Sequence, residues 1–150
     1  MPNASNLQHP TSIKGTWALV ATEWKRADGK HANPFGANAL GIVIYDGAGN
    51  MSAQVMHEGR TQPPATQPSG IDTAMASATP GYIAYFGTYA VDEAAWTIAH
   101  HVAGSAYPAW VGLDITRRFK IEGNRLTMSA SVVTSDGVAA EAATIWERVG

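Results

Sequence analysis

The chain contains 150 residues, of which 45% are hydrophobic and 15% charged, and its formal net charge at pH 7 is -2. This length is typical of one domain with a single core, and the slightly negative charge argues against a nucleic-acid-binding surface. Because the chain has no cysteine, structural disulfides, thiolate metal sites and a cysteine nucleophile are excluded.

The first residues of the chain are polar and contain two prolines, so we expect residues 1–12 to form a flexible arm and residues 13–150 a single domain. Residues 1–10 lack the basic and apolar stretches of a signal peptide. The sequence nowhere contains the run of about 18 apolar residues that a membrane span needs. We therefore expect a cytoplasmic protein that does not bind membranes.

The first expected strand covers residues 13–24. Its alternate residues are Ile13, Gly15, Trp17, Leu19 and Ala21. This period of two is typical of a strand with one face on a core. Glu23 takes the next position of the same row, where a carboxylate destabilises the fold unless it is paired or hydrogen-bonded. We therefore expect Glu23 to face inward and to have a partner elsewhere in the chain.

Turn residues divide the rest of the chain into further strands. The sequence Asp-Gly-Ala-Gly-Asn at 46–50 and the sequence Glu-Gly-Asn at 122–124 are strong hairpin signals. Residues 25–38 are rich in turn formers and predict a loop across one end of the fold. The expected strands cover residues 13–24, 40–45, 51–58, 81–91, 95–103, 110–121, 125–133 and 139–149.

Residues 61–80 form the least regular part of the sequence, with four prolines and many small side chains. Their lack of apolar periodicity predicts a long, mobile surface connection, or lid, over one end of the fold.

Eight short strands joined mostly by tight turns form a meander, which leaves two strand edges exposed unless the sheet closes. An eight-stranded closed barrel removes both edges and leaves an interior that holds side chains or one small ligand. We therefore predict an all-β fold, an antiparallel up-and-down eight-stranded barrel.

Several short motifs resemble those of lipocalins. Gly15-Thr16-Trp17 is similar to the Gly-x-Trp signature of their first strand, and Arg148 resembles the arginine that packs across that tryptophan. The motifs that carry the wider resemblance are Asp28-Gly29, Pro34-Phe35-Gly36, Met51-Ser52-Ala53-Gln54, Gly81-Tyr82, Tyr85-Phe86-Gly87-Thr88-Tyr89, His100-His101-Val102, Pro108-x-Trp110 and Trp146-Glu147-Arg148.

In this order the motifs resemble the small lipocalin-like family of bacteria and fungi, over residues 15–149. The resemblance implies a calycin-type barrel with an internal cavity, and it implies that Arg148 stacks on Trp17, a cation–π contact of about 0.5–2 kcal/mol. The biochemical roles of that family are poorly defined. Because this chain has no disulfide, extracellular transport is not carried over from secreted lipocalins.

Four ionisable residues interrupt or end the apolar rows of the expected strands. His100 lies in the apolar row of the fifth strand, whereas His101 falls on its opposite face. Arg117 lies in the apolar row of the sixth strand, His57 ends that of the third, and Glu23 ends that of the first. We therefore expect these side chains to point toward the interior.

Arg117 is the natural partner for Glu23, because a planar guanidinium satisfies a carboxylate with two parallel hydrogen bonds. His100 would then bind or protonate a ligand. The alternative interpretation is that Glu23 and Arg117 form a structural pair and His100 is a hydrogen-bonded core histidine. A register slip of one residue would exchange His100 with His101.

The aromatic residues Tyr85, Tyr89, Trp96 and Trp110 either line a pocket or simply fill the barrel. The complete set of candidate ligand-binding residues is Glu23, His57, Tyr85, Tyr89, Trp96, His100, Trp110 and Arg117.

No cofactor is expected. The adjacent His100 and His101 point to opposite faces and have no further ligand at metal-binding spacing. Ser105 lacks the strand-turn-helix setting of a nucleophile elbow, and the glycine-containing turns match no dinucleotide fingerprint.

Three functional hypotheses remain from the sequence. The first is a barrel that binds a small, largely apolar molecule, oriented by His100, Arg117 and Glu23. The second is a cofactor-independent isomerase, cyclase or dehydratase for a polyketide- or terpenoid-like substrate, with His100 or Glu23 as acid or base and Arg117 polarising a carbonyl. The third is a structural or interaction module, which a filled barrel would favour. In each case we expect a monomer or homodimer.

Overall fold

A computed structural model describes residues 12–32, 35–60, 81–133 and 137–149 of the chain. Residues 1–11, most of the expected arm, and the expected surface connection at 61–80 lie outside these ranges. No helix within the described ranges is long and apolar enough to cross a membrane.

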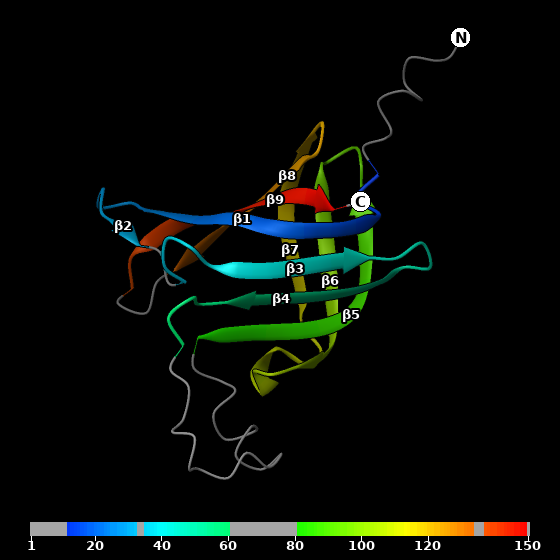
Figure 1. Cartoon of the computed structure of the whole chain (residues 1–150), viewed down its shortest axis with the longest axis horizontal. Helices are drawn as coiled ribbons and strands as arrows, with labels where there is room; N and C mark the ends of the chain where they lie inside the picture. The colour runs from blue at the N-terminus through cyan, green and yellow to red at the C-terminus, as the bar shows by residue number, and fades with distance from the viewer. Residues whose placement is uncertain (1–11, 33–34, 61–80, 134–136, 150) are drawn as a thin grey trace.

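The described residues fold into antiparallel strands that follow one another around a ring. The elements are β1 (Gly15–Arg26), β2 (His31–Ala32), β3 (Leu40–Tyr45), β4 (Asn50–Met56), β5 (Tyr82–Asp92), β6 (Thr97–Ser105), the 3-10 helix η2 (Pro108–Trp110), β7 (Asp114–Glu122), β8 (Arg125–Val133) and β9 (Ala139–Val149). In Figure 1, β1, β3, β4 and β5 run side by side across the front, and β6 to β8 cross behind them.

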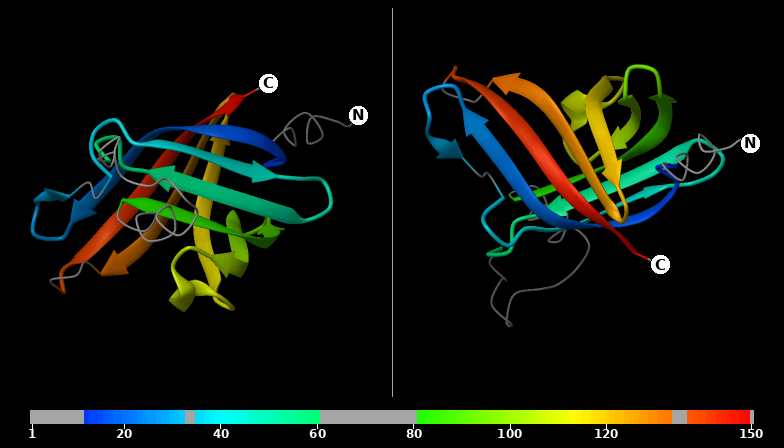
Figure 2. Two further views of the ribbon diagram at one scale, coloured as in Figure 1. Left: turned by 60° about the horizontal axis from the view of Figure 1, so that its bottom comes forward. Right: turned by 90° about the horizontal axis from the view of Figure 1, so that it is seen from above.

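Pairing of the first strand with the last closes the barrel, as the two views in Figure 2 show. The β1–β9 ladder runs from Thr16 opposite Val149 to Arg26 opposite Ala140. β1 and β3 to β9 make eight strands, and the two-residue β2 extends the sheet beside the end of β1. The predicted eight-stranded up-and-down barrel is therefore confirmed. Closure pairs both strand edges of the meander.

The strand expected at residues 110–121 begins later than predicted. The chain forms the 3-10 helix η2 at Pro108–Trp110, and Gly112 adopts a positive φ of 89°, so β7 starts at Asp114. Val111 and Leu113, which strict alternation along the same row as Arg117 would place inward, are therefore exposed.

The packing of Trp17 explains why the Gly-x-Trp motif occurs at this end of the barrel. Trp17 is fully buried, and the guanidinium carbon of Arg148 lies 4.2 Å from its ring centroid. Gly15 has a φ of +127°, and a Cβ on this residue would lie 2.8 Å from Arg148 Nη1. Glycine thus provides both the backbone conformation and the room for the arginine. The expected stacking of Arg148 on Trp17 is confirmed.

A β-bulge changes the face of the residues in the second half of β1. Leu19 pairs with Trp146 and Ala21 pairs with Ile145, so Val20 is an extra residue without a partner on β9. After the bulge, Thr22 is buried, whereas Glu23 is exposed. The expectation that Glu23 faces inward is therefore wrong, because strict alternation does not continue through a bulge.

Candidate functional site

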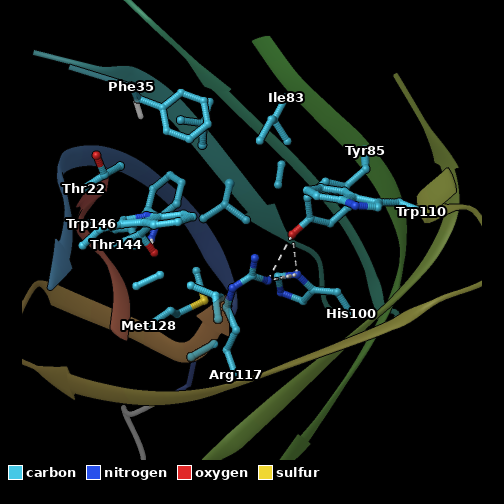
Figure 3. Close-up of a pocket in the computed structure, with 17 residues that line it drawn as sticks. Thr22, Phe35, Ile83, Tyr85, His100, Trp110, Arg117, Met128, Thr144 and Trp146 are labelled. Atoms are coloured by element: carbon cyan, nitrogen blue, oxygen red, sulfur yellow. Dashed lines mark hydrogen bonds between the residues drawn. The ribbon is translucent and has the colours of Figure 1, made fainter. Parts of the chain in front are cut away.

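The barrel encloses a cavity of about 350 Å³, a volume in the range of small-molecule pockets. Its wall is mostly apolar. The aromatic side chains in the wall are Trp24, Phe35, Tyr85, Trp110 and Trp146. Figure 3 shows Phe35, Tyr85, Trp110 and Trp146 around an open centre, with Phe35 and Trp110 on different sides. The interior is hollow, so the hypothesis of a filled barrel is wrong.

The polar side chains of the wall fall into two groups. Thr22, Thr144 and Trp146 lie together, and Trp146 Nε1 donates a 2.8 Å hydrogen bond to Thr144 Oγ1. Tyr85, His100 and Arg117 form the other group (Figure 3). Among the wall residues that the structure describes, Arg117 alone carries a permanent charge.

His100 links two tyrosines that come from different strands. Its side chain is 1% exposed. His100 Nε2 lies 2.7 Å from the Tyr45 hydroxyl of β3, and His100 Nδ1 lies 2.8 Å from the Tyr85 hydroxyl of β5. Arg117 Nη1 lies 3.4 Å from the Tyr85 hydroxyl and 3.5 Å from His100 Nδ1. Both ring nitrogens of the histidine are thus engaged with protein groups.

The partners of this network assign the position of the ring proton. The guanidinium of Arg117 can only donate, so the nearby Nδ1 of His100 is the acceptor and Nε2 carries the proton. The Tyr45 hydroxyl then accepts from Nε2 and donates to Met128 Sδ at 3.5 Å. Tyr85 donates its proton to Nδ1 and accepts from Arg117. The hydrogen bonds of this network therefore all run in one direction, from Arg117 to Met128.

Burial keeps both His100 and Tyr45 neutral. Desolvation, followed by the charge of Arg117, lowers the pKa of His100 from 6.5 to about 3. Desolvation likewise raises the pKa of Tyr45 well above its usual value of 10. At neutral pH the group around Arg117 therefore contains one positive charge and no negative one.

Among the residues that the structure describes, no carboxylate lies within 4 Å of Arg117. The polar neighbours of its guanidinium there are Tyr85 and His100. The predicted Glu23–Arg117 pair is therefore wrong. The bulge at Val20 turns Glu23 to the outer surface, away from the interior that Arg117 faces.

Four of the eight candidate ligand-binding residues line the cavity, namely Tyr85, His100, Trp110 and Arg117. His100 faces inward and His101 is exposed beside Asp114. The expected register on this strand is therefore confirmed, and the one-residue slip that would exchange the two histidines does not occur.

The other candidates lie elsewhere in the described structure. His57 Nδ1 accepts a hydrogen bond from the Gly59 amide at 3.0 Å, outside the cavity wall. Tyr89 packs edge-on against Tyr45 and donates to the Asp46 carbonyl at 2.6 Å. Trp96, with a positive φ of 54°, is 46% exposed and packs on Phe119. Tyr89 and Trp96 therefore pack at sites outside the cavity wall.

Sequence reasoning missed several wall residues, among them those on β8 and β9. The apolar rows that contain them run through Leu126, Met128, Ala130 and Val132, and through Ala140, Ala142, Thr144 and Trp146. The same period-two test that identified Arg117 would have placed these residues inside. Trp24 and Thr22 carry no such signal, because their inward position depends on the bulge.

The described part of the chain contains no group of three or more histidine, cysteine, aspartate or glutamate residues arranged to hold a metal ion.

Comparison with known proteins identifies a family and a relative. The family model of the lipocalin-like domain matches residues 14–149. A protein of Aspergillus oryzae named 4'-hydroxy-3'-methoxypropiophenone carrier protein ppsC is 37% identical over 86 residues, which cover 53% of this chain and 78% of that protein.

Proposed function

Because the chain belongs to the lipocalin-like domain family, we propose that it binds a small, largely apolar molecule inside its barrel and acts as a carrier. The observation that carries this proposal is the cavity of about 350 Å³, with an apolar wall and one charged side chain, Arg117. Pockets of this size and composition are typical of small-molecule sites.

The ligand that fits this wall best is aromatic and has an oxygen atom at one end. Aromatic side chains such as Trp24 and Trp146 offer edges and faces to a planar ring. Arg117 offers N–H donors to a carbonyl or another oxygen acceptor. The related carrier is named for an aryl ketone that also bears a hydroxyl and a methoxy group. We extend that chemical class, and no single compound, to this chain.

Tryptophan fluorescence tests the proposal directly, because Trp24, Trp110 and Trp146 all line the cavity. The probe is 4'-hydroxy-3'-methoxypropiophenone, with other small aryl ketones as a panel. We expect saturable quenching with one site per chain.

Two neighbouring substitutions on β8 provide the control. Ala130 faces the cavity, whereas Ser131 is exposed on the outer face. Ala130→Phe should fill the cavity and weaken binding at least about tenfold, equivalent to about 1.4 kcal/mol, while Ser131→Phe should leave it unchanged. Absence of saturable binding across the panel, or equal binding by both variants, contradicts the proposal.

The enzyme hypothesis is weaker because His100 is poorly suited to acid–base chemistry. Both of its ring nitrogens are hydrogen-bonded to tyrosines, and its pKa is lowered to about 3. Glu23, the other candidate acid or base, is exposed on the outer surface. We therefore assign His100 a positioning role, in which it orients the Tyr85 hydroxyl. A bound ligand should be recovered chemically unchanged after prolonged incubation, and catalytic turnover of the probe would favour an enzyme instead.

We also infer a cytoplasmic location and a monomer or homodimer. The absence of cysteine supports a reducing compartment. Cell fractionation tests the location, and light scattering on the purified protein tests the oligomeric state.

A further inference from the structure

We propose that the cavity binds its ligand as a monoanion, with the charged oxygen of an aromatic molecule placed at the guanidinium of Arg117. This inference rests on the proposed function, since it describes the ionisation state of the same ligand. It starts from the positive charge of Arg117, which has no carboxylate partner among the described residues.

A charge inside an apolar cavity is costly unless another charge compensates it. The ionisable groups that face Arg117 are Tyr85 from β5, His100 from β6 and, behind His100, Tyr45 from β3. The wall residues supplied by β1, β4, β8 and β9 have no ionisable side chain. Within the described structure, no side chain supplies the neutralising charge, and an anionic ligand would supply it.

The direction of these hydrogen bonds also favours an anionic ligand. Tyr85 uses its proton on His100 Nδ1, and the proton on Nε2 is used on Tyr45. The charged donors at this end of the cavity, among the described residues, are N–H groups of Arg117, which cannot accept a hydrogen bond. A positively charged ligand would meet a like charge, whereas an oxyanion would meet a charge-assisted donor. Figure 3 shows the guanidinium of Arg117 reaching toward the Tyr85 hydroxyl beside the open centre.

Two kinds of aromatic molecule carry such an oxyanion, an acidic phenol and a carboxylate. A phenol conjugated to a para carbonyl ionises more readily than tyrosine, because the negative charge is delocalised onto the carbonyl oxygen. On binding, the phenol O–H bond would break, the electron pair would stay on the oxygen, and the proton would pass to the solvent buffer.

The test measures the ionisation of a bound phenol. The probe is 4'-hydroxy-3'-methoxypropiophenone, whose phenolate absorbs at longer wavelength than its phenol. An opposite charge nearby lowers the pKa of an acid by about one to three pH units. We therefore expect the pKa of the bound probe to lie at least about one pH unit below that of the free probe, so that the phenolate binds at least about tenfold more tightly than the phenol.

Two neighbouring arginines on β7 provide matched variants. Arg117 lines the cavity, whereas Arg118 pairs with Glu141 on the outer surface. Arg118→Met should keep the lowered pKa of the bound probe, and Arg117→Met should abolish it. A bound pKa equal to or above the free value, or a lowering that survives Arg117→Met, overturns the inference.

Two further ligands keep the test decisive if Arg117→Met fails to fold. With wild-type protein, the affinity for the phenol should rise with pH up to the pKa of the free probe, while the affinity for its methyl ether, 3',4'-dimethoxypropiophenone, should not. Equal pH dependence of the two overturns the inference. If 3,4-dimethoxybenzoate binds more tightly than the phenolate, the cavity does bind an oxyanion. The charged group of its ligand is then a carboxylate.

The outcomes also separate this inference from the proposed function. If the probe and its methyl ether both bind in the cavity without a change in pKa, the carrier function stands and the anionic state is wrong. If neither the ketones nor the carboxylate bind, both proposals fail.

Discussion

His100 is the residue around which the polar side of the cavity is organised. It is buried, and it connects β3 to β5 through hydrogen bonds to Tyr45 and Tyr85. A buried neutral histidine with both nitrogens bonded fixes the rotamers of its partners. The ligand therefore meets a preorganised Tyr85 and Arg117.

The buried histidine predicts a specific pH dependence of stability. The pKa of His100 is about 3 in the folded protein and 6.5 in the reference state, so below pH 6.5 the unfolded chain binds a proton that the folded chain does not. Its stabilising contribution is complete above pH 6.5 and decreases as the pH falls, by about 1.4 kcal/mol per pH unit. Urea unfolding between pH 6.5 and pH 5 measures this slope, above the range in which most carboxylates titrate.

Two glutamine variants serve as controls for this prediction. His100→Gln should remove most of the slope, because glutamine can bond both tyrosines without titrating. His101→Gln should retain it, since His101 is exposed on the other face. Equal slopes in both variants would rule out His100 as the source.

Arg148 predicts a stability effect at the other end of the interior. Its guanidinium covers Trp17 and donates to the carbonyls of Lys14 and Ser12 at 2.8 and 2.9 Å. Arg148→Ala should lower the free energy of unfolding by about 1 kcal/mol or more through lost packing and cation–π contact. Chemical denaturation gives the value. Arg125→Ala, which removes only a surface pair with Glu147, should have a smaller effect, and an equal loss would contradict the role of the stacking.

At the scale of single elements, β1 determines which residues face the cavity. Before the bulge its odd-numbered residues face the interior, and after the bulge Thr22 and Trp24 do. Because of the extra residue Val20, Thr22 and Trp24 lie in the wall in place of Ala21 and Glu23. A bulge also increases the local twist of a strand, which suits the point where β1 leaves β3 and continues beside β9 and β2.

This change of face predicts opposite outcomes for adjacent substitutions. Glu23→Ala should change the free energy of unfolding by less than about 0.5 kcal/mol, because the side chain is exposed. Thr22→Asp should destabilise by about 2 kcal/mol or more, because it places a carboxylate at a position that is 3% exposed. Thermal or urea unfolding of the two variants measures both changes in the free energy of unfolding. A larger loss for Glu23→Ala would mean that the strand lacks the bulge.

For the whole molecule, closure of the ring joins the two ends of the described chain. Thr16 pairs with Val149, and every other strand pair in the barrel joins neighbours along the sequence. The entropy of closing so long a loop has to be overcome before the β1–β9 contacts form.

This topology predicts slow folding. All-β proteins with many distant pairings fold in milliseconds to seconds, whereas helical bundles fold faster. Stopped-flow dilution from urea, followed by tryptophan fluorescence, should show refolding in that time range. Completion within microseconds would mean that the β1–β9 ladder is not required for the fluorescence change.

The sequence by itself determined the architecture. Period-two apolar rows, glycine-containing turns at 46–50 and 122–124, and the need to pair both edges were sufficient to predict an eight-stranded barrel. These signals are local, because each depends on residues a few positions apart. The resemblance of Gly15, Trp17 and Arg148 to a known motif added the packing at one end. On β6 and β7, local alternation also placed His100 and Arg117 inside, and Tyr85 on β5 was among the aromatic candidates.

The tertiary structure alone decided how these side chains meet. A single extra residue at Val20 shows in the apolar row only as a carboxylate at an expected inward position, yet it moves Glu23 out of the interior and leaves Arg117 without a carboxylate partner in the described structure. Tyr45, 55 residues before His100 in the chain, reaches it only because closure of the barrel brings β3 and β6 to face each other across the interior. Partners and charge balance depend on register and curvature between distant strands, which the local periodicity of a sequence does not encode.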